Sequence, residues 1–273
     1  MIIFPNAKIN LGLNVVDKRA DGFHNINTVF YPIVLCDVLE IIESRNGESS
    51  FFNTGFIIND NTNNNLCIKA LKLIKSDFSI PETSIFLHKK IPFGAGLGGG
   101  SSDAACVLTL LNKMFELNIN QTKLMQYAAM LGSDCAFFIK NKPQFAVGRG
   151  EIMTDIDLNL NGYYLVLIKP NVSVSTAQAY ADIIPRQPEI CISEIILKPI
   201  ELWKNLLFND FETSVFARFP QIKEIKETLY SKGAIYASMS GSGSSVYGLF
   251  EKKPDISDFT KDYFVFEKLF DDY

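Results

Sequence analysis

The sequence predicts an α+β fold divided into two domains, and three observations support this prediction. In the first half, a strand-like run over residues 84–89 leads through a glycine-rich stretch into a helical run that begins near Asp103. In the second half, strands and helices are mixed in an order that favours an α+β arrangement. Between the halves, residues 155–162 show little apolar patterning. The chain has 273 residues, enough for two ordinary domains, and we place these at residues 1–155 and 156–273.

A strand predicted over residues 2–16 opens the first domain. Its polar and apolar residues alternate, so that Lys8 and Asn10 share one face. A solvated sheet face would explain them, but in an otherwise apolar strand a polar pair that points into a cleft is equally consistent. A turn over residues 17–25, strands over 26–36 and 38–43, a loop over 59–65 and a helix over 66–78 that this loop can cap are predicted to follow.

Two further helices are predicted after the helix that follows the glycine-rich stretch. The first covers residues 121–131 and is ended by Gly132, and the second is a short apolar helix over 134–139 that Ser133 can cap. Asp134 is the carboxylate at the head of this short helix, where an acidic side chain is stabilising in its own right. The apolar residues beside it would also desolvate the carboxylate and make it a stronger base. From the residues alone, both roles are open.

The second domain begins with a buried strand, predicted over residues 163–169 and ended by Pro170. Pro220 suits the first turn of a helix, because proline is tolerated where the N–H has no partner. The helices predicted in this domain cover residues 175–183, 199–207, 209–218 and 220–232. Two further strands are predicted over residues 234–238 and 246–251.

Composition argues against several classes of function. The formal net charge is −4 and there is no basic block, so we expect neither nucleic acid nor an anionic membrane surface as a partner. The N-terminal residues lack the features of a signal peptide and no apolar run is long enough to span a bilayer, so we expect a cytoplasmic protein. The five cysteines are scattered and fit reduced thiols, and with only two histidines the sequence offers few ligands for a His-based zinc site.

The glycine-rich stretch is the strongest candidate for a ligand site. Residues 91–103 read IPFGAGLGGGSSD. The N–H groups of such a loop, with a helix N-terminus behind it, can bind phosphate, although a glycine cluster is more often a turn or linker. Gly94-x-Gly96-x-x-Gly99 matches the dinucleotide-binding pattern, but a second helix follows where that fold needs a strand with an acidic end. The ATPase-type loop does not fit, because no lysine follows the glycines.

Three segments, in this order, resemble the three sequence motifs of the GHMP kinases. They are PNAKINL at residues 5–11, PFGAGLGGGSS at 92–102 and MSGSGS at 239–244. Shorter segments resemble the branch of this family that acts on a cytidyl-diphosphate substrate of the non-mevalonate isoprenoid pathway. These are RADGFH at 19–24, the triple glycine at 98–100, LGSD at 131–134 and VSVST at 172–176. The similarity runs through nearly the whole chain and fades in its last residues.

The resemblance implies a fold and a reaction. The fold is the two-domain GHMP kinase fold, with an N-terminal domain like domain 2 of ribosomal protein S5 and a ferredoxin-like C-terminal domain. The reaction is transfer of the γ-phosphoryl group of ATP to the 2-hydroxyl of a methylerythritol moiety. The resemblance makes Asp134 the base or orienting group for that hydroxyl. Lys8 would keep Asp134 ionised and stabilise the transferring phosphoryl group.

Binding roles are implied by the same resemblance. Asn10 would bind the substrate near the reacting hydroxyl. Phe23 and Tyr180 would stack on the cytosine ring, His24 would read its polar edge and Thr176 would line the same pocket, although a helix core residue is an equally good reading of Tyr180. Mg²⁺ would bridge the phosphates of ATP, and we expect a monomer or weak homodimer. The residues that would wrap the triphosphate are Pro92, Phe93, Gly94, Ala95, Gly96, Leu97, Gly98, Gly99, Gly100, Ser101 and Ser102.

The sequence departs from the family pattern in three ways. Phe23 stands where tyrosine is more usual, Cys135-Ala136 replace a common Val-Pro, and no glutamate in the motifs fills the Mg²⁺-ligand role of some relatives. We therefore assign no metal ligand.

Two alternatives remain. One is another GHMP kinase that acts on a small alcohol, which would have no need of an aromatic clamp. The other is a non-catalytic nucleotide-binding protein of the same fold, against which the presence of both Lys8 and Asp134 argues.

Overall fold

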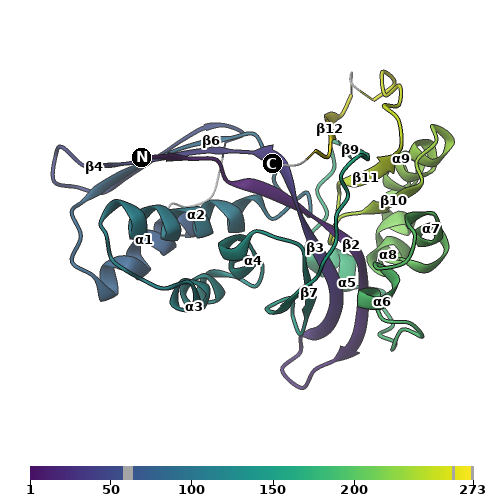
Figure 1. Ribbon diagram of the computed structural model, residues 1–273, viewed down its shortest axis with the longest axis horizontal. Helices are drawn as coiled ribbons and strands as arrows, with labels where there is room; N and C mark the ends of the chain where they lie inside the picture. The colour runs from purple at the N-terminus through teal and green to yellow at the C-terminus, as the bar shows by residue number, and fades with distance from the viewer. Residues whose placement is uncertain (58–63, 260–261, 272–273) are drawn as a thin grey trace. The chain divides into compact units, whose positions relative to one another are not determined.

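The computed structural model describes residues 1–57, 64–259 and 262–271 (Figure 1). The chain forms two compact units, and each unit is assembled from separate segments. Unit 1 contains Met1–Lys8, Pro32–Phe93 and Gly98–Lys142, and unit 2 contains Ile9–Tyr31, Gly94–Leu97 and Pro143–Tyr273. The sequence-predicted division after residue 155 treats the domains as continuous stretches and stays a prediction. Most of the loop predicted over residues 59–65 lies outside the described residues.

Unit 1 is a four-stranded sheet with helices on one face. The strand order is β1-β4-β6-β5, in which β5 pairs parallel with β6 and the other pairs are antiparallel. The four helices lie on the same side of the sheet, where α2 contacts β4 and the other three helices pack on α2 (Figure 1). The strands are β1 (Ile2–Ile3), β4 (Val38–Glu43), β5 (Ser50–Gly55) and β6 (Thr83–Lys89), and the helices are α1 (Leu66–Asp77), α2 (Gly99–Met114), α3 (Gln121–Leu131) and α4 (Cys135–Lys140).

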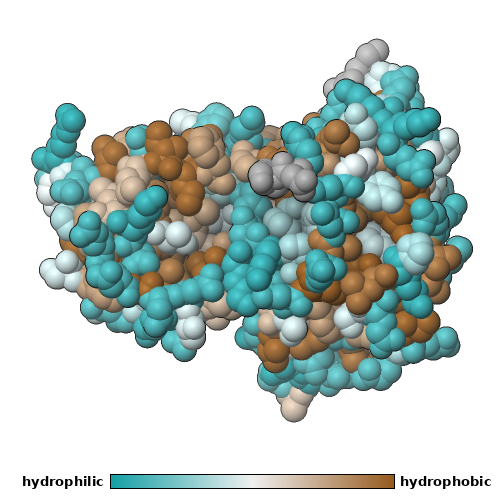
Figure 2. Space-filling view, in the orientation of Figure 1, coloured by the Kyte–Doolittle hydropathy of each residue, from teal (hydrophilic) through white to brown (hydrophobic). Residues whose placement is uncertain are grey.

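Strand β6 shows how the sheet of unit 1 divides its side chains. Ile85 and Leu87 are buried, whereas Phe86 between them is exposed, as the two-residue period of a strand requires. Phe86 stacks on Phe52 of β5, with ring centroids 4.9 Å apart and both rings exposed. Figure 2 shows hydrophobic residues gathered over the part of unit 1 that holds β4 and β6.

A second sheet has the order β2-β3-β7-β8. Its strands are β2 (Asn6–Lys18), β3 (His24–Cys36), β7 (Gln144–Val147) and β8 (Ile152–Asp155). The strand predicted over residues 2–16 is therefore two strands, because Pro5 has no N–H to donate to a ladder. β2 carries the first predicted motif through Lys8 and Asn10.

The third sheet lies in unit 2 and has the order β10-β11-β9-β12, with all pairs antiparallel. Numbered along the chain, this is the 2-3-1-4 order of a ferredoxin-like sheet, as predicted. The strands are β9 (Tyr164–Lys169), β10 (Tyr236–Met239), β11 (Val246–Phe250) and β12 (Phe264–Leu269), with helices α8 (Phe211–Arg218) and α9 (Pro220–Ser231).

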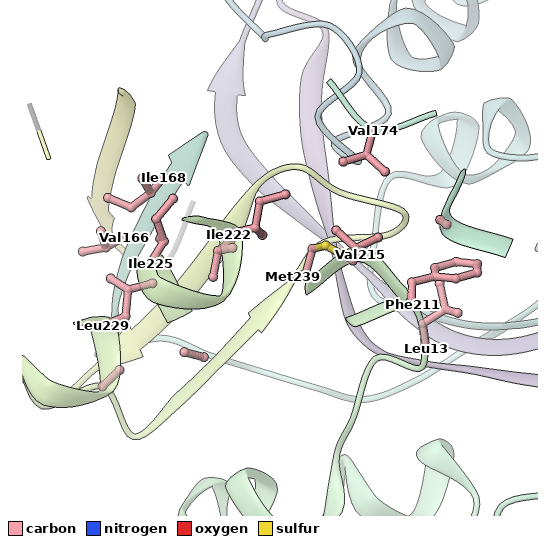
Figure 3. Packing of buried hydrophobic residues seen from close by; sticks show 14 of the residues in the cluster. Leu13, Val166, Ile168, Val174, Phe211, Val215, Ile222, Ile225, Leu229 and Met239 are labelled. Carbon is pink, nitrogen blue, oxygen red and sulfur yellow. The ribbon is translucent and has the colours of Figure 1, made fainter. Parts of the chain in front are cut away.

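One hydrophobic cluster holds unit 2 together (Figure 3). Apolar residues of α8 and α9 pack against those of β9, β10 and the middle of β2. Val215, Ile222 and Leu229 have no exposed surface, and burial of each such side chain contributes about 1.5–3 kcal/mol. The cluster includes Leu13, Val166, Ile168, Val174, Phe211, Val215, Ile222, Ile225, Leu229 and Met239.

Several elements differ from those predicted. β5 and β12 are not predicted, because both are sheet-edge strands whose partly exposed residues lack a clean alternation. The hairpin of β7 and β8 has strands too short to recognise, although its turn is rich in glycine. Helix α5 (Thr176–Tyr180) is shorter than predicted, α6 (Ile192–Ile195) is not predicted, and the helix predicted over 199–207 is η2 (Ile200–Leu202) followed by α7 (Trp203–Leu206).

Two further predictions concern the whole chain. All five cysteines are free thiols. Among the described residues, no helix combines the length and the apolar character that crossing a bilayer requires.

Candidate active site

The glycine-rich loop is held by two buried side chains and a close contact with motif three. Ala95 and Leu97 are buried and alternate with the glycines. Gly96 has φ +72°, and a Cβ on it would lie 1.9 Å from the carbonyl oxygen of Ser240. Only glycine can therefore occupy this position, because both the backbone conformation and the space exclude a side chain.

The end of the loop becomes the start of α2. Gly98 adopts the left-handed conformation at the N-cap of α2. The helix begins at Gly99, whereas the sequence predicted a start near Asp103, four residues later. The first N–H groups of a helix have no intrahelical partner and favour anions. The start of α2 is therefore a place where an anion would be favoured.

Lys8 and Asp134 meet beside this helix start. The distance between Lys8 Nζ and Asp134 Oδ2 is 3.5 Å, with Lys8 buried and the Asp134 side chain one-third exposed. A Cβ on Gly98 would lie 3.2 Å from Lys8 Cγ, so the lysine stem passes directly under the loop. Lys8 and Asn10 are both almost fully buried, which rules out the solvated sheet face as the explanation for them.

Asp134 does not cap α4 with its side chain. It occupies the N-cap position of α4 but makes no side-chain capping hydrogen bond, and the predicted cap at Ser133 is wrong. Burial lowers the pKa of the Lys8 ammonium, and the charge and hydrogen bond of Asp134 act in the opposite direction. The pair therefore consists of a buried cation that depends on its carboxylate partner and a carboxylate that solvent or a ligand can reach.

Asn10 links β2 to the glycine-rich loop through motif three. Its backbone N–H donates to Ser240 Oγ at 3.2 Å, and that hydroxyl donates to the carbonyl of Gly96 at 2.8 Å. The side-chain amide of Asn10 donates to Thr28 Oγ1 at 2.9 Å. Ser240 thus fixes the backbone of β2 against the loop.

The predicted nucleobase residues form a group within unit 2. The rings of His24 and Tyr180 are stacked with centroids 4.7 Å apart, and Tyr180 and Phe211 form a T-shaped pair. Thr176 is the first residue of α5, whose last residue is Tyr180. Phe23 is 55% exposed, and the Arg149 guanidinium lies over its ring, 5.0 Å from the centroid. Tyr180 is therefore both a partly buried core residue and half of an aromatic stack.

No metal site is built into the described residues, since no group of three His, Cys, Asp or Glu side chains there could hold an ion. Mg²⁺ commonly keeps several water and phosphate ligands and uses one or two protein carboxylates. A nucleotide-borne Mg²⁺ fits this chain, because Asp134 offers a partly exposed carboxylate.

Some residues that the structure brings to the site were not singled out in the sequence. One is Arg149, which lies over the Phe23 ring, and three others, Lys89, Asp37 and Asp103, form a buried ion cluster beneath α2. A carboxylate on the apolar stripe of α2 is the signal that could have revealed this cluster. A cavity of about 330 Å³ in unit 2 is lined by residues including Asn14, Arg186 and Asp210 and contains none of the predicted site residues.

Comparison with known proteins agrees with the motifs. The model of the GHMP kinases N terminal domain matches residues 65–142, and that of the GHMP kinases C terminal domain matches residues 191–262. The 4-diphosphocytidyl-2-C-methyl-D-erythritol kinase of Bacteroides fragilis is 55% identical over 259 residues, which are 94% of each chain.

Solved structures of GHMP kinases resemble this protein as well. A crystal structure of 4-(cytidine 5'-diphospho)-2C-methyl-D-erythritol kinase superposes with a TM-score of 0.78 at 32% identity, covering 91% of this chain and 90% of that one. The Methanococcus jannaschii mevalonate kinase shares the fold, with a TM-score of 0.69 at 16% identity and coverage of 99% and 98%. The chain therefore belongs to the GHMP kinases, in the branch of the 4-diphosphocytidyl-2-C-methyl-D-erythritol kinases. The predicted fold class and family are confirmed, and ATP is the phosphoryl donor of this family.

Proposed function

We propose that this protein transfers the γ-phosphoryl group of ATP to the 2-hydroxyl of 4-diphosphocytidyl-2-C-methyl-D-erythritol. The observation that carries the proposal is the Lys8–Asp134 pair, 3.5 Å apart and beside the glycine-rich loop. A relative named as this kinase is 55% identical to the protein, and the similarity covers 94% of each chain. We expect it to act in the cytoplasm, as a monomer or weak homodimer.

The proposed chemistry needs positioning and charge more than covalent help. Asp134 accepts a hydrogen bond, and then the proton, from the substrate hydroxyl. Lys8, held beside Asp134, places a positive charge where negative charge develops on the transferring group. Asp134 is free of a capping bond and one-third exposed, so its carboxylate can reach an incoming hydroxyl.

ATP is proposed to bind through the main chain of Pro92–Ser102. The N–H groups of the loop and of the first turn of α2 would hold the phosphate oxygens. Mg²⁺ bound with the nucleotide would supply charge neutralisation, and the partly exposed carboxylate of Asp134 is a candidate protein ligand. Ser240 would keep the loop in register with Asn10, because its hydroxyl contacts both.

The cytidine end is proposed to be recognised within unit 2. Tyr180 makes a T-shaped contact with Phe211, and one face of its ring is stacked by His24 in this structure. A cytosine would take its place between Tyr180 and Phe23 after a rotation of the imidazole, and His24 and Thr176 would then face the edge of the base.

Substitution of Tyr180 tests this recognition. Tyr180→Leu keeps apolar bulk against Phe211 but removes the ring, so we expect KM for the cytidyl substrate to rise about 5- to 150-fold, the range that corresponds to one base–aromatic stack. KM for ATP should change little. Tyr180→Phe is the matched control and should keep KM for the cytidyl substrate within about threefold, because the ring remains. Equal effects of the two substitutions would contradict stacking on Tyr180.

A coupled ADP-release assay tests the activity itself. Mg·ATP would be supplied with 4-diphosphocytidyl-2-C-methyl-D-erythritol, and with mevalonate and homoserine as control acceptors. Turnover with the cytidyl substrate alone is the expected result. Turnover with a control alcohol would favour the first alternative, another small-alcohol kinase. A folded, ATP-binding protein without turnover would favour the non-catalytic alternative.

A further inference from the structure

A buried ion cluster lies beneath the first turn of α2. Lys89 Nζ donates to Asp103 Oδ2 at 2.7 Å and also to Asp37 Oδ2. All three side chains are at most 2% exposed. With one cation and two carboxylates, the cluster carries a net charge of −1 when every group is ionised.

The cluster joins three segments that the proposed site uses. Asp37 Oδ1 accepts hydrogen bonds from the N–H groups of Lys90 and Ile91, at 2.6 and 2.8 Å, where β6 enters the glycine-rich loop. The backbone N–H of Asp37 donates to the carbonyl of Pro5 at 2.8 Å, at the start of the strand that carries Lys8. Asp103 belongs to α2 itself.

Lys89 also contacts the loop directly. A Cβ on Gly99, the first residue of α2, would lie 3.1 Å from Lys89 Nζ, and the ammonium lies 5.4 Å from the ring centroid of Phe93. The cluster thus packs directly under the start of α2. Its net charge therefore acts on any phosphate bound at the N-terminus of this helix.

The cluster is built to hold a proton. Among the described residues no donor reaches Asp103 Oδ1. Burial raises the pKa of Asp103 to about 7, and Asp37 adds to this increase while Lys89 opposes it. Burial acts to lower the pKa of Lys89, but the two carboxylates together bring it above its usual value, so the lysine stays charged.

The neighbouring ionisable groups do not replace Asp103 in this role. On α1 and α2, burial raises the pKa of Cys67 well above its usual value and that of Cys106 to about 12. Cys36, beside Asp37, also has a raised pKa because of burial. These thiols stay neutral near pH 7, and the remaining ionisable neighbour of Asp37 is Lys90, whose backbone N–H donates to it.

We propose that Lys89, Asp37 and Asp103 are positioning residues for the phosphate-binding loop, and that ATP binds preferentially when Asp103 carries a proton. This rests on the proposed ATP site. Protonation changes the net charge of the cluster from −1 to 0. This change removes the repulsion between the cluster and the phosphates of ATP. ATP binding and proton uptake are therefore linked, and affinity falls as the pH rises through the range in which Asp103 ionises.

Calorimetric titration of ATP between pH 7 and 9, without acceptor, tests the proposal. In the wild-type protein we expect Kd to rise about three- to tenfold per pH unit once Asp103 ionises, the slope of one linked proton. Asp103→Asn mimics the protonated group and should lose this dependence. Lys8, whose pKa burial lowers, contributes equally to both proteins. Asp258→Asn, in an exposed ion pair with Lys232, is the matched control and should retain the wild-type slope.

A second measurement needs no variant. At pH 8, where ATP itself is fully ionised, binding to the wild-type protein should take up a fraction of a proton, read from binding enthalpies in buffers of different ionisation enthalpy. Absence of uptake, or parallel pH dependence in wild type and Asp103→Asn, would overturn the proposal. Both experiments read ATP binding alone, so failure of the acceptor assay would overturn the proposed function and leave this inference standing.

Discussion

Replacement of Asp134 by Asn is expected to lower kcat by about 10²- to 10⁴-fold, the contribution typical of a positioned general base. The substitution keeps the shape of the side chain and removes its charge. No capping bond is lost, because Asp134 makes none. Lys8 loses the partner whose charge opposes the effect of burial on its pKa, so the phosphoryl group also loses part of its stabilising charge.

Steady-state kinetics and an ATP titration check this prediction together. KM for ATP should stay within about threefold of wild type, because the main chain of the loop binds the phosphates. Ser133→Ala is the neighbouring control and should behave as wild type, since Ser133 does not cap α4. A kcat for Asp134→Asn near the wild-type value would remove Asp134 from the mechanism.

Replacement of Gly96 by Ala is expected to destabilise the fold by about 2–5 kcal/mol. About 1–2 kcal/mol comes from placing an L-residue at φ +72°, and about 1–3 kcal/mol comes from overpacking. The added Cβ would lie 1.9 Å from the Ser240 carbonyl oxygen, and backbone must move to admit it. This movement would disturb the Ser240 hydroxyl, which contacts both Gly96 and Asn10.

Urea denaturation of a matched pair measures the effect. Gly162 also has a positive φ, +88°, but a Cβ there would meet nothing within 4 Å. Gly162→Ala should therefore cost only the conformational part, about 1–2 kcal/mol. Equal losses in the two variants would show that contact with motif three adds nothing to the requirement for glycine at residue 96.

The pairing of Lys8 with Asp134, which we propose to be catalytic, involves residues that the sequence singled out, whereas the ion cluster could not be predicted. Lys8 and Asp134 lie in segments that resemble family motifs, and the structure brings their charged atoms together. Lys89, Asp37 and Asp103 come from three elements whose pairing depends on how the helices pack on the sheet. The position of Lys89 at the end of a strand does not predict that its ammonium group pairs with two buried carboxylates.

Local signals also set the limits of the fold prediction. Strongly periodic helices such as α3 were predicted to the residue, and the start of α2 was placed too late because a run of glycines does not resemble a helix. The aromatic residues were assigned by resemblance. The spacing of His24 and Tyr180 in the sequence did not predict that their rings stack on each other. The position of Arg149 over Phe23 is equally a matter of tertiary structure.

The most direct test of the proposed reaction is the proton-coupled ³¹P NMR spectrum of the product formed from 4-diphosphocytidyl-2-C-methyl-D-erythritol and Mg·ATP. C2 of the methylerythritol moiety bears the methyl group and the hydroxyl and no hydrogen. We therefore expect one new phosphomonoester resonance, a singlet, beside the two coupled signals of the intact diphosphate. A new resonance split by coupling to a carbon-bound hydrogen would place the phosphoryl group on another hydroxyl, and either that result or no new resonance from folded, ATP-binding protein would contradict the proposed function.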